Sequence, residues 1–152
     1  MTEDHLPPLR RPEDTPPIRT QADLERHWRT LMGPLGFSER LLWVLLLAAD
    51  GRVTPVLQQI GDLPQLPDVP MVDALMRVFR QICDELGNGS VAVLLSRPGR
   101  AGITPAERTW ARRLTDAAAA SGVRLWPVHV ANDDELAPVT PNDLTVPRTA
   151  AG

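Results

Sequence analysis

The spacing of apolar residues along the chain predicts alternating helices and strands. Apolar positions recur at helical spacing in three segments, which we expect to be helices: 20–32, 71–86 and 104–121. Apolar runs without that spacing predict strands in four segments: 39–49, 52–60, 90–95 and 123–131. The predicted order is therefore helix, strand, strand, helix, strand, helix, strand.

Capping and turn residues mark the ends of these segments. Thr104, with Glu107 three residues later, forms a capping box that opens the third helix. The apolar run at 39–49 could be a buried helix or a buried strand, because both of its faces are apolar. The Asp50-Gly51 pair directly after it is a hairpin signal, so we interpret the run as a strand.

This order predicts an α/β (α+β) fold, a mixed β-sheet with a leading hairpin that is covered by about three helices. The hairpin requires antiparallel pairing, whereas the two helical crossovers favour parallel pairing with right-handed connections. Pro55 lies inside the second predicted strand and lacks a backbone N–H. We therefore expect an edge position or a bulge there.

The two ends of the chain differ in composition from its centre. Residues 1–19 contain five prolines and many charges, which predicts a disordered lead. The segment from about Asn132 onward is similar, with consecutive acidic residues and further prolines. We therefore expect one folded domain over residues 20–139 and a flexible tail over residues 140–152.

Charge and cysteine content narrow the functional classes. The 152 residues carry 16 basic and 19 acidic side chains, and this net charge of −3 argues against nucleic acid as a partner. The single cysteine, Cys83, excludes an intrachain disulfide and fits a reducing compartment. The first residues lack the basic and apolar regions of a signal peptide, and the longest apolar run is too short to span a bilayer. We therefore expect a cytoplasmic protein without a membrane partner.

The loop between residues 96 and 104 joins a predicted strand to a predicted helix, a position where active-site loops commonly lie. Neither this loop nor the first two residues of the predicted helix include a His, Cys, Asp or Glu, and the first such residue is Glu107. Backbone N–H groups at a helix start attract anions, and guanidinium groups add to that attraction. Arg97, Arg100 and Thr104 are therefore the candidate ligand-binding residues. The alternative is that both arginines are simply solvated.

Four stretches of the sequence resemble one known family. They are the Glu39 strand that ends at Asp50-Gly51, the turn Gln59-Ile60-Gly61-Asp62, the loop Leu95-Ser96-Arg97-Pro98-Gly99 and the helix start Thr104-Pro105-Ala106-Glu107. Together with the order of elements, they resemble the RadC-like branch of the JAB/MPN (JAMM) metalloprotease-like superfamily over residues 37–139. The resemblance implies a JAB/MPN-like fold.

In that family two His and one Asp bind zinc, and an upstream Glu acts on the zinc-bound water. The corresponding positions here hold Leu95, Arg97 and Thr109, and only the carboxylate of Glu39 is retained. A catalytic zinc needs three protein ligands and one open position, which these side chains do not supply. The resemblance therefore implies a pseudoenzyme without a metal or another cofactor, in which Glu39 is a relic of the catalytic set.

These observations predict a catalytically inactive domain that acts as a protein-protein interaction or scaffolding module. Its partner would be another protein or a second copy of the chain, and an exposed apolar patch would favour this function. The alternative is an anion- or nucleotide-binding domain that uses the loop from Arg97 to Thr104. A third hypothesis is a metal-independent hydrolase that uses Ser96 and Glu39, although Ser96 has no evident His partner.

Overall fold

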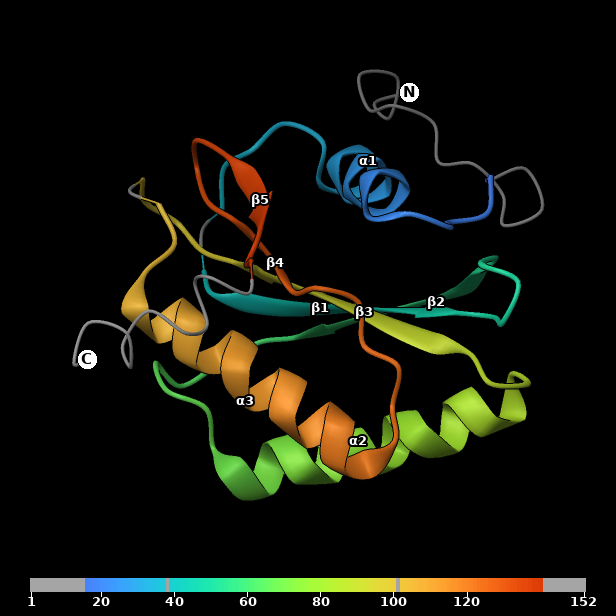
Figure 1. The fold of residues 1–152 in the computed structure, drawn as a ribbon. Coiled ribbons are helices and arrows are strands. Elements are labelled where there is room, and N and C mark those ends of the chain that lie inside the picture. Colours follow the sequence, from blue (N-terminus) through green and yellow to red (C-terminus); the bar gives the residue numbers. More distant parts are fainter. Residues whose placement is uncertain (1–15, 38, 101, 141–152) are drawn as a thin grey trace.

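The computed structural model describes residues 16–37, 39–100 and 102–140, and within them the chain forms three helices and five strands (Figure 1). The elements in chain order are α1 (Gln21–Met32), β1 (Leu41–Leu47), β2 (Val53–Ile60), α2 (Val69–Glu85), β3 (Ser90–Ser96), α3 (Pro105–Ser121), β4 (His129–Ala131) and β5 (Leu136–Pro138). The predicted α/β class, with a mixed sheet and three helices, is confirmed. No helix in the described part of the chain has the length and apolar character needed to cross a lipid bilayer.

The strands form one mixed sheet in the order β2-β1-β3-β4-β5. β1 pairs antiparallel with β2, which confirms the predicted hairpin, and β1 also pairs antiparallel with β3. β3 and β4 run parallel across the α3 crossover, and β5 returns antiparallel to β4. β2 is an edge strand, so the missing N–H of Pro55 is tolerated there.

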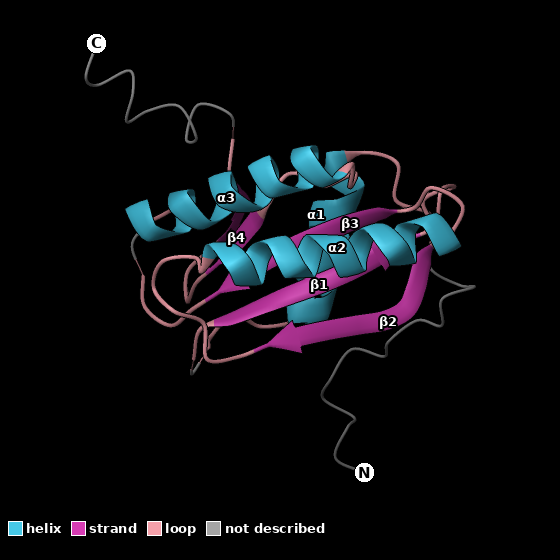
Figure 2. Cartoon of the chain, turned by 90° about the horizontal axis from the view of Figure 1, so that it is seen from below, coloured by secondary structure: helices cyan, strands magenta, loops and turns pink. Residues whose placement is uncertain are grey.

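Helices cover both faces of this sheet. Figures 1 and 2 show α2 and α3 side by side on one face, and α1 on the other face beside β5. Leu42, Val44 and Leu46 of β1 pack toward α2 and α3, whereas Leu45 and Leu47 pack toward α1. Because both faces of β1 are buried, its sequence is an unbroken apolar run without polar alternation.

Local sequence signals determine where the helices begin and end. The hydroxyl of Thr104 accepts the backbone N–H of Glu107, and the Glu107 carboxylate accepts the backbone N–H of Thr104. This reciprocal pair is the predicted capping box. α3 ends at Gly122, which adopts the left-handed conformation (φ +74°) that glycine tolerates best.

The C-terminal part of the domain differs from the sequence-based expectation. A strand is predicted over residues 123–131, but β4 comprises only His129–Ala131. Upstream of β4, residues 124 and 126 bond to the backbone of Val91, and Pro127 then interrupts the ladder because it has no N–H to donate. The segment after Asn132, whose composition resembles that of the lead and for which no strand is predicted, turns back as β5, and Leu136 is buried.

The folded part also begins before residue 20. Ile18 is buried in the core on the α1 side, and its backbone N–H donates to the carbonyl of Gly51 at 2.8 Å. Gly51 has a φ of +90°, and a side chain there would collide with the Ile18 carbonyl, so this close approach requires glycine. Residues 1–15 of the predicted lead and residues 141–152 of the predicted tail lie outside the described residues.

Candidate functional site

A small pocket lies where β3 ends and the chain leads into α3, at the position predicted for a functional loop. Its volume is about 260 Å³, and its wall includes Leu95, Ser96, Arg97, Thr104, Glu107 and Trp110. We call it the β3–α3 pocket. The indole N–H of Trp110 donates to the carbonyls of Pro64 and Gln65, which holds the loop before α2 against the pocket.

Arg97 is held inside the protein by an ion pair with Glu107. The Arg97 Nε lies 2.6 Å from Glu107 Oε2, and its Nη2 donates to the Gly102 carbonyl at 2.8 Å. Only 15% of the Arg97 side chain and 9% of the Glu107 side chain are exposed. Because the carboxylate neutralises the guanidinium and engages its donors, Arg97 is poorly placed to bind an external anion.

The other two candidate ligand-binding residues lie in different surroundings. The hydroxyl of Thr104 accepts the backbone N–H of Glu107 at 3.1 Å, so it serves as the helix cap. Arg100 is exposed outside the wall of the pocket, and its Nε lies 3.6 Å from Oδ1 of Asp134. The structure therefore brings Arg97 and Thr104 together around Glu107, and it directs Arg100 toward the turn between β4 and β5.

The two residues of the hydrolase hypothesis do not share this pocket. Ser96 is fully buried, and its hydroxyl oxygen accepts the indole N–H of Trp43 at 2.9 Å. Glu39 is exposed and does not belong to the wall of the β3–α3 pocket. The pocket therefore does not connect a serine nucleophile to the Glu39 carboxylate.

The positions that hold zinc ligands in the resembled family do not provide a metal site here. Leu95 is a buried aliphatic side chain, and Arg97 is a cation paired with a carboxylate. The hydroxyl of Thr109 donates to the Pro105 carbonyl at 3.0 Å. Zinc prefers thiolate, imidazole and carboxylate ligands, so these residues do not fit it. Among the described residues, no three His, Cys, Asp or Glu side chains lie together in a way that could hold a metal ion.

Asp133 organises the loops beside the pocket, a role that the sequence analysis does not identify. Its carboxylate oxygens accept the backbone N–H groups of Gly99 at 2.8 Å and of Phe37 at 3.2 Å. These hydrogen bonds, chiefly the one from Gly99, hold the pKa of Asp133 below its usual value. The side chain of the preceding Asn132 accepts two N–H groups of the following residues, as Asx turns do. The run of Asn and Asp is thus the sequence signal for this turn.

His129 is a buried titratable residue outside the pocket. It lies in β4 with no exposed surface, and its Nδ1 is 3.0 Å from the Pro127 carbonyl. Its Nε2 has no hydrogen-bond partner among the described residues. Burial lowers the pKa of His129, so the ring is neutral at pH 7, with the Nδ1 proton donated to the carbonyl.

No model of a known protein family matches the chain, and no curated protein matches it significantly. The fold and the site define a mixed α/β domain whose β3–α3 pocket is lined by the Arg97–Glu107 ion pair.

Proposed function

We propose that this chain is a catalytically inactive, RadC-like JAB/MPN-like domain that acts in the cytoplasm as a protein-interaction module, with a second copy of the chain as its partner. The observation that carries the proposal is the Arg97–Glu107 ion pair. It occupies the place where the resembled family gathers its catalytic groups, and it uses that place for an internal contact. A domain whose charged pocket residues are paired with each other in this way acts most simply through its surface.

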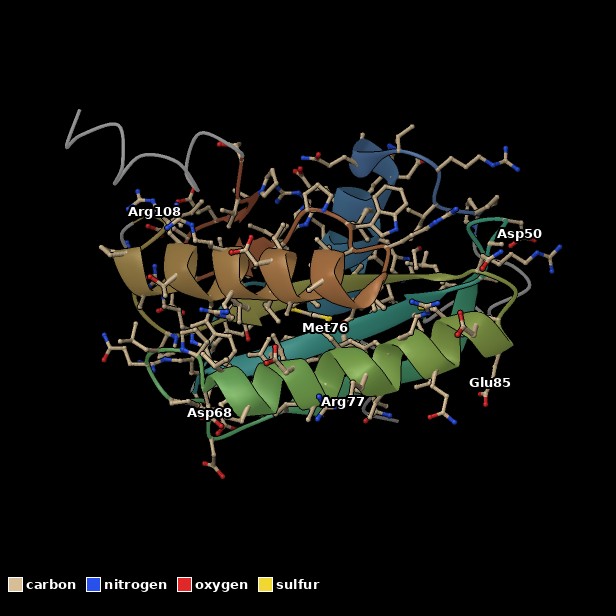
Figure 3. The ribbon with its side chains drawn as sticks, turned by 60° about the horizontal axis from the view of Figure 1, so that its bottom comes forward. Asp50, Asp68, Met76, Arg77, Glu85 and Arg108 are labelled. Carbon is tan, nitrogen blue, oxygen red and sulfur yellow. The ribbon has the colours of Figure 1, made fainter. Side chains whose placement is uncertain are left out.

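α2 and the loop before it carry exposed apolar side chains of the kind found on interaction surfaces. Leu66, Val69 and Val78 are 58%, 40% and 52% exposed, and they are the exposed large apolar side chains among the described residues. Met76 points from the opposite side of α2 into the core, whereas Arg77 projects away from the sheet (Figure 3). Apolar side chains on an otherwise polar outer helix face favour pairing with another surface.

The outer face of α2 is complementary to itself. Pro70, Ala74 and Val78 are spaced four residues apart and form one exposed stripe, which Asp73 and Arg77 flank. When two copies of α2 pair antiparallel with Ala74 at the two-fold axis, Val78 meets Pro70 of the other copy, and Arg77 meets Asp73. Within the described part of the chain, neither Asp73 nor Arg77 forms an ion pair, so both are available for this contact.

A charge reversal tests this pairing. Because both copies have the same sequence, one substitution changes the proposed Arg77–Asp73 contact on both sides of the two-fold axis. Arg77→Glu places two acids opposite each other and should convert a dimer to a monomer, as measured by sedimentation equilibrium. The double variant Asp73→Arg with Arg77→Glu restores opposite charges and should restore the dimer. Asp116→Arg reverses the charge of an exposed residue on α3 and should leave the mass unchanged.

The outcomes of this experiment are distinct. Equal masses for the wild type and for Arg77→Glu would contradict the pairing through α2, and a wild type that is always monomeric would contradict self-association. Circular dichroism of each variant separates lost pairing from lost folding, because all substituted side chains are exposed. Restoration by the double variant would identify the pair of residues that meet.

A further inference from the structure

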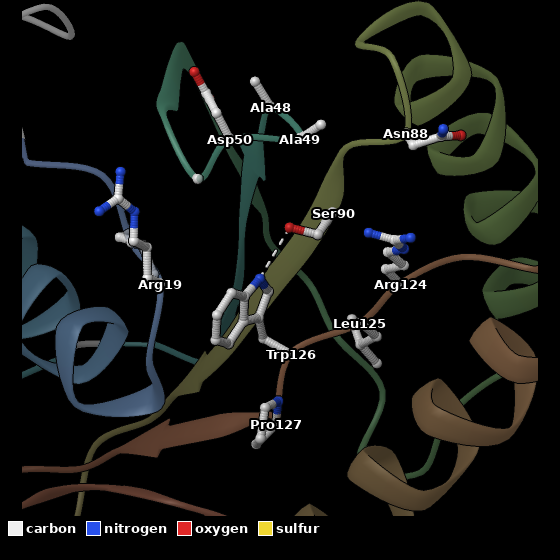
Figure 4. Close-up of a pocket in the computed structure, with 12 residues that line it drawn as sticks. Arg19, Ala48, Ala49, Asp50, Asn88, Ser90, Arg124, Leu125, Trp126 and Pro127 are labelled. Carbon is white, nitrogen blue, oxygen red and sulfur yellow. Dashed lines mark hydrogen bonds between the residues drawn. The ribbon is translucent and has the colours of Figure 1, made fainter.

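A second, larger cleft lies at the opposite end of β3 from the β3–α3 pocket. Its volume is about 830 Å³, which is within the range of small-molecule sites. We call it the Trp126 cleft, and its polar and aromatic lining residues are Arg19, Asp50, Asn88, Ser90, Arg124 and Trp126 (Figure 4). These residues come from the segment before α1, the turn between β1 and β2, the turn between α2 and β3, the start of β3 and the segment before β4. The proposed interaction through α2 does not use this cleft.

Two arginines give the Trp126 cleft an excess of positive charge. Arg19 and Arg124 are exposed, and neither guanidinium forms a hydrogen bond or ion pair with another described residue. Asp50 is the acidic side chain in the described wall of the cleft, and it forms an ion pair with Arg52, whose Nε lies 3.4 Å from Asp50 Oδ2. Unengaged guanidinium groups bind phosphate through paired N–H donors, so these two arginines differ from Arg97, whose donors are engaged by Glu107.

The indole of Trp126 supplies a fixed aromatic surface in the same cleft. Its Nε1 donates to the Ser90 hydroxyl oxygen at 2.9 Å, and part of the ring packs against the core on the α1 side. The half-buried ring also lines the cleft, and in the view of Figure 4 it lies between Arg19 and Arg124. An aromatic ring held in this way provides a face on which a planar base can stack.

We propose that the Trp126 cleft binds a nucleotide, with its phosphate held by Arg19 and Arg124 and its base against Trp126. Asn88 and Asp50 stand in the wall of the cleft as hydrogen-bond partners for sugar hydroxyls or for the edge of the base. A bare anion would not require the aromatic ring, and an apolar ligand would not require the two arginines. The combination favours a ligand that carries both a phosphate and a planar ring.

The test measures binding of AMP to the full-length chain by isothermal titration calorimetry, with adenosine and inorganic phosphate as separate probes. AMP should bind, and each of the other probes should bind at least roughly tenfold more weakly, because each lacks one of the two recognised groups. The double variant Arg19→Ala with Arg124→Ala should weaken AMP binding by a similar factor. Arg100→Ala removes an exposed arginine near the other end of the sheet and should leave AMP binding unchanged.

Trp126→Leu separates the role of the ring from that of the arginines. It should weaken AMP binding and leave the weaker binding of inorganic phosphate unchanged, provided that circular dichroism shows a folded variant. Absence of AMP binding to the wild type would overturn the proposal, as would undiminished binding by the folded double-arginine variant. Equal affinities for AMP and adenosine, or for AMP and phosphate, would also overturn it. Loss of AMP binding in Arg100→Ala would place the ligand at the loop after β3 and refute the assignment to this cleft.

Discussion

Removal of the Glu107 carboxylate should destabilise the domain strongly, because it deprives the mostly buried Arg97 guanidinium of the carboxylate that pairs with it. The two side chains approach to 2.6 Å and are 15% and 9% exposed. Removing one partner of a buried ion pair costs about 3–5 kcal/mol. The lower end applies here, because Arg97 keeps its hydrogen bond to the Gly102 carbonyl. Glu107 also accepts the backbone N–H of Thr104, and loss of this cap adds about 1 kcal/mol.

We therefore expect Glu107→Ala to lower the free energy of unfolding by about 4 kcal/mol. For a domain of this size, each kcal/mol corresponds to about 2–4 °C, so the melting temperature should fall by roughly 8–16 °C. Urea unfolding at a fixed protein concentration, followed by tryptophan fluorescence, measures the free energy directly. The matched control is Asp84→Ala, which breaks the exposed Arg80–Asp84 pair and should cost less than about 0.5 kcal/mol.

A double-mutant cycle tests whether the two charges act together. Arg97→Met combined with Glu107→Leu leaves no buried charge, so the double variant should be more stable than the sum of the single effects predicts. If Glu107→Ala lowers the free energy of unfolding by less than about 1 kcal/mol, the reasoning is refuted, because exposed ion pairs contribute that little to stability. Strict additivity in the cycle would also refute it, since groups in direct contact should couple.

Three further changes probe other contacts. Gly51→Ala should lower the free energy of unfolding in urea by about 2 kcal/mol or more, because φ is +90° and the new methyl group collides with the Ile18 carbonyl. The free energy of unfolding should fall as the pH drops from about 7 to 5. Folding lowers the pKa of His129 below its ordinary value of 6.5, so protonation in this range favours the unfolded chain. His129→Gln should reduce this dependence of the unfolding free energy on pH. Asp133→Ala should speed hydrogen exchange at the Gly99 amide, which loses its carboxylate acceptor, and unchanged exchange there would show that the hydrogen bond does not order the loop.

The helices, the hairpin and the class of the sheet depend largely on residues that are close in the sequence. Thr104 and Glu107 are three residues apart, so their capping box can be recognised in the amino-acid sequence alone. The apolar run that becomes β1 is ambiguous by itself, and the adjacent Asp50-Gly51 turn resolves it correctly as a strand of a hairpin. Local chemistry is therefore sufficient to predict these elements.

The chemistry of the β3–α3 pocket depends on contacts between distant residues. Arg97 and Glu107 are ten residues apart, and their side chains meet only after the intervening loop has folded back. Asp133 bonds to residues that are 34 and 96 positions away, which no local pattern reveals. β5 escaped prediction because its segment is acidic and contains proline, a composition that it shares with tails. Tertiary pairing with β4 overrides that local preference.

The native mass of the wild-type chain tests the proposed self-association most directly. Sedimentation equilibrium over a range of protein concentrations reports whether a second copy binds, without assuming which residues meet. We predict a reversible dimer of two 16.7 kDa chains, which Arg77→Glu converts to the monomer. A mass of 16.7 kDa at every concentration of the wild type would contradict the proposal that this chain acts by pairing with itself.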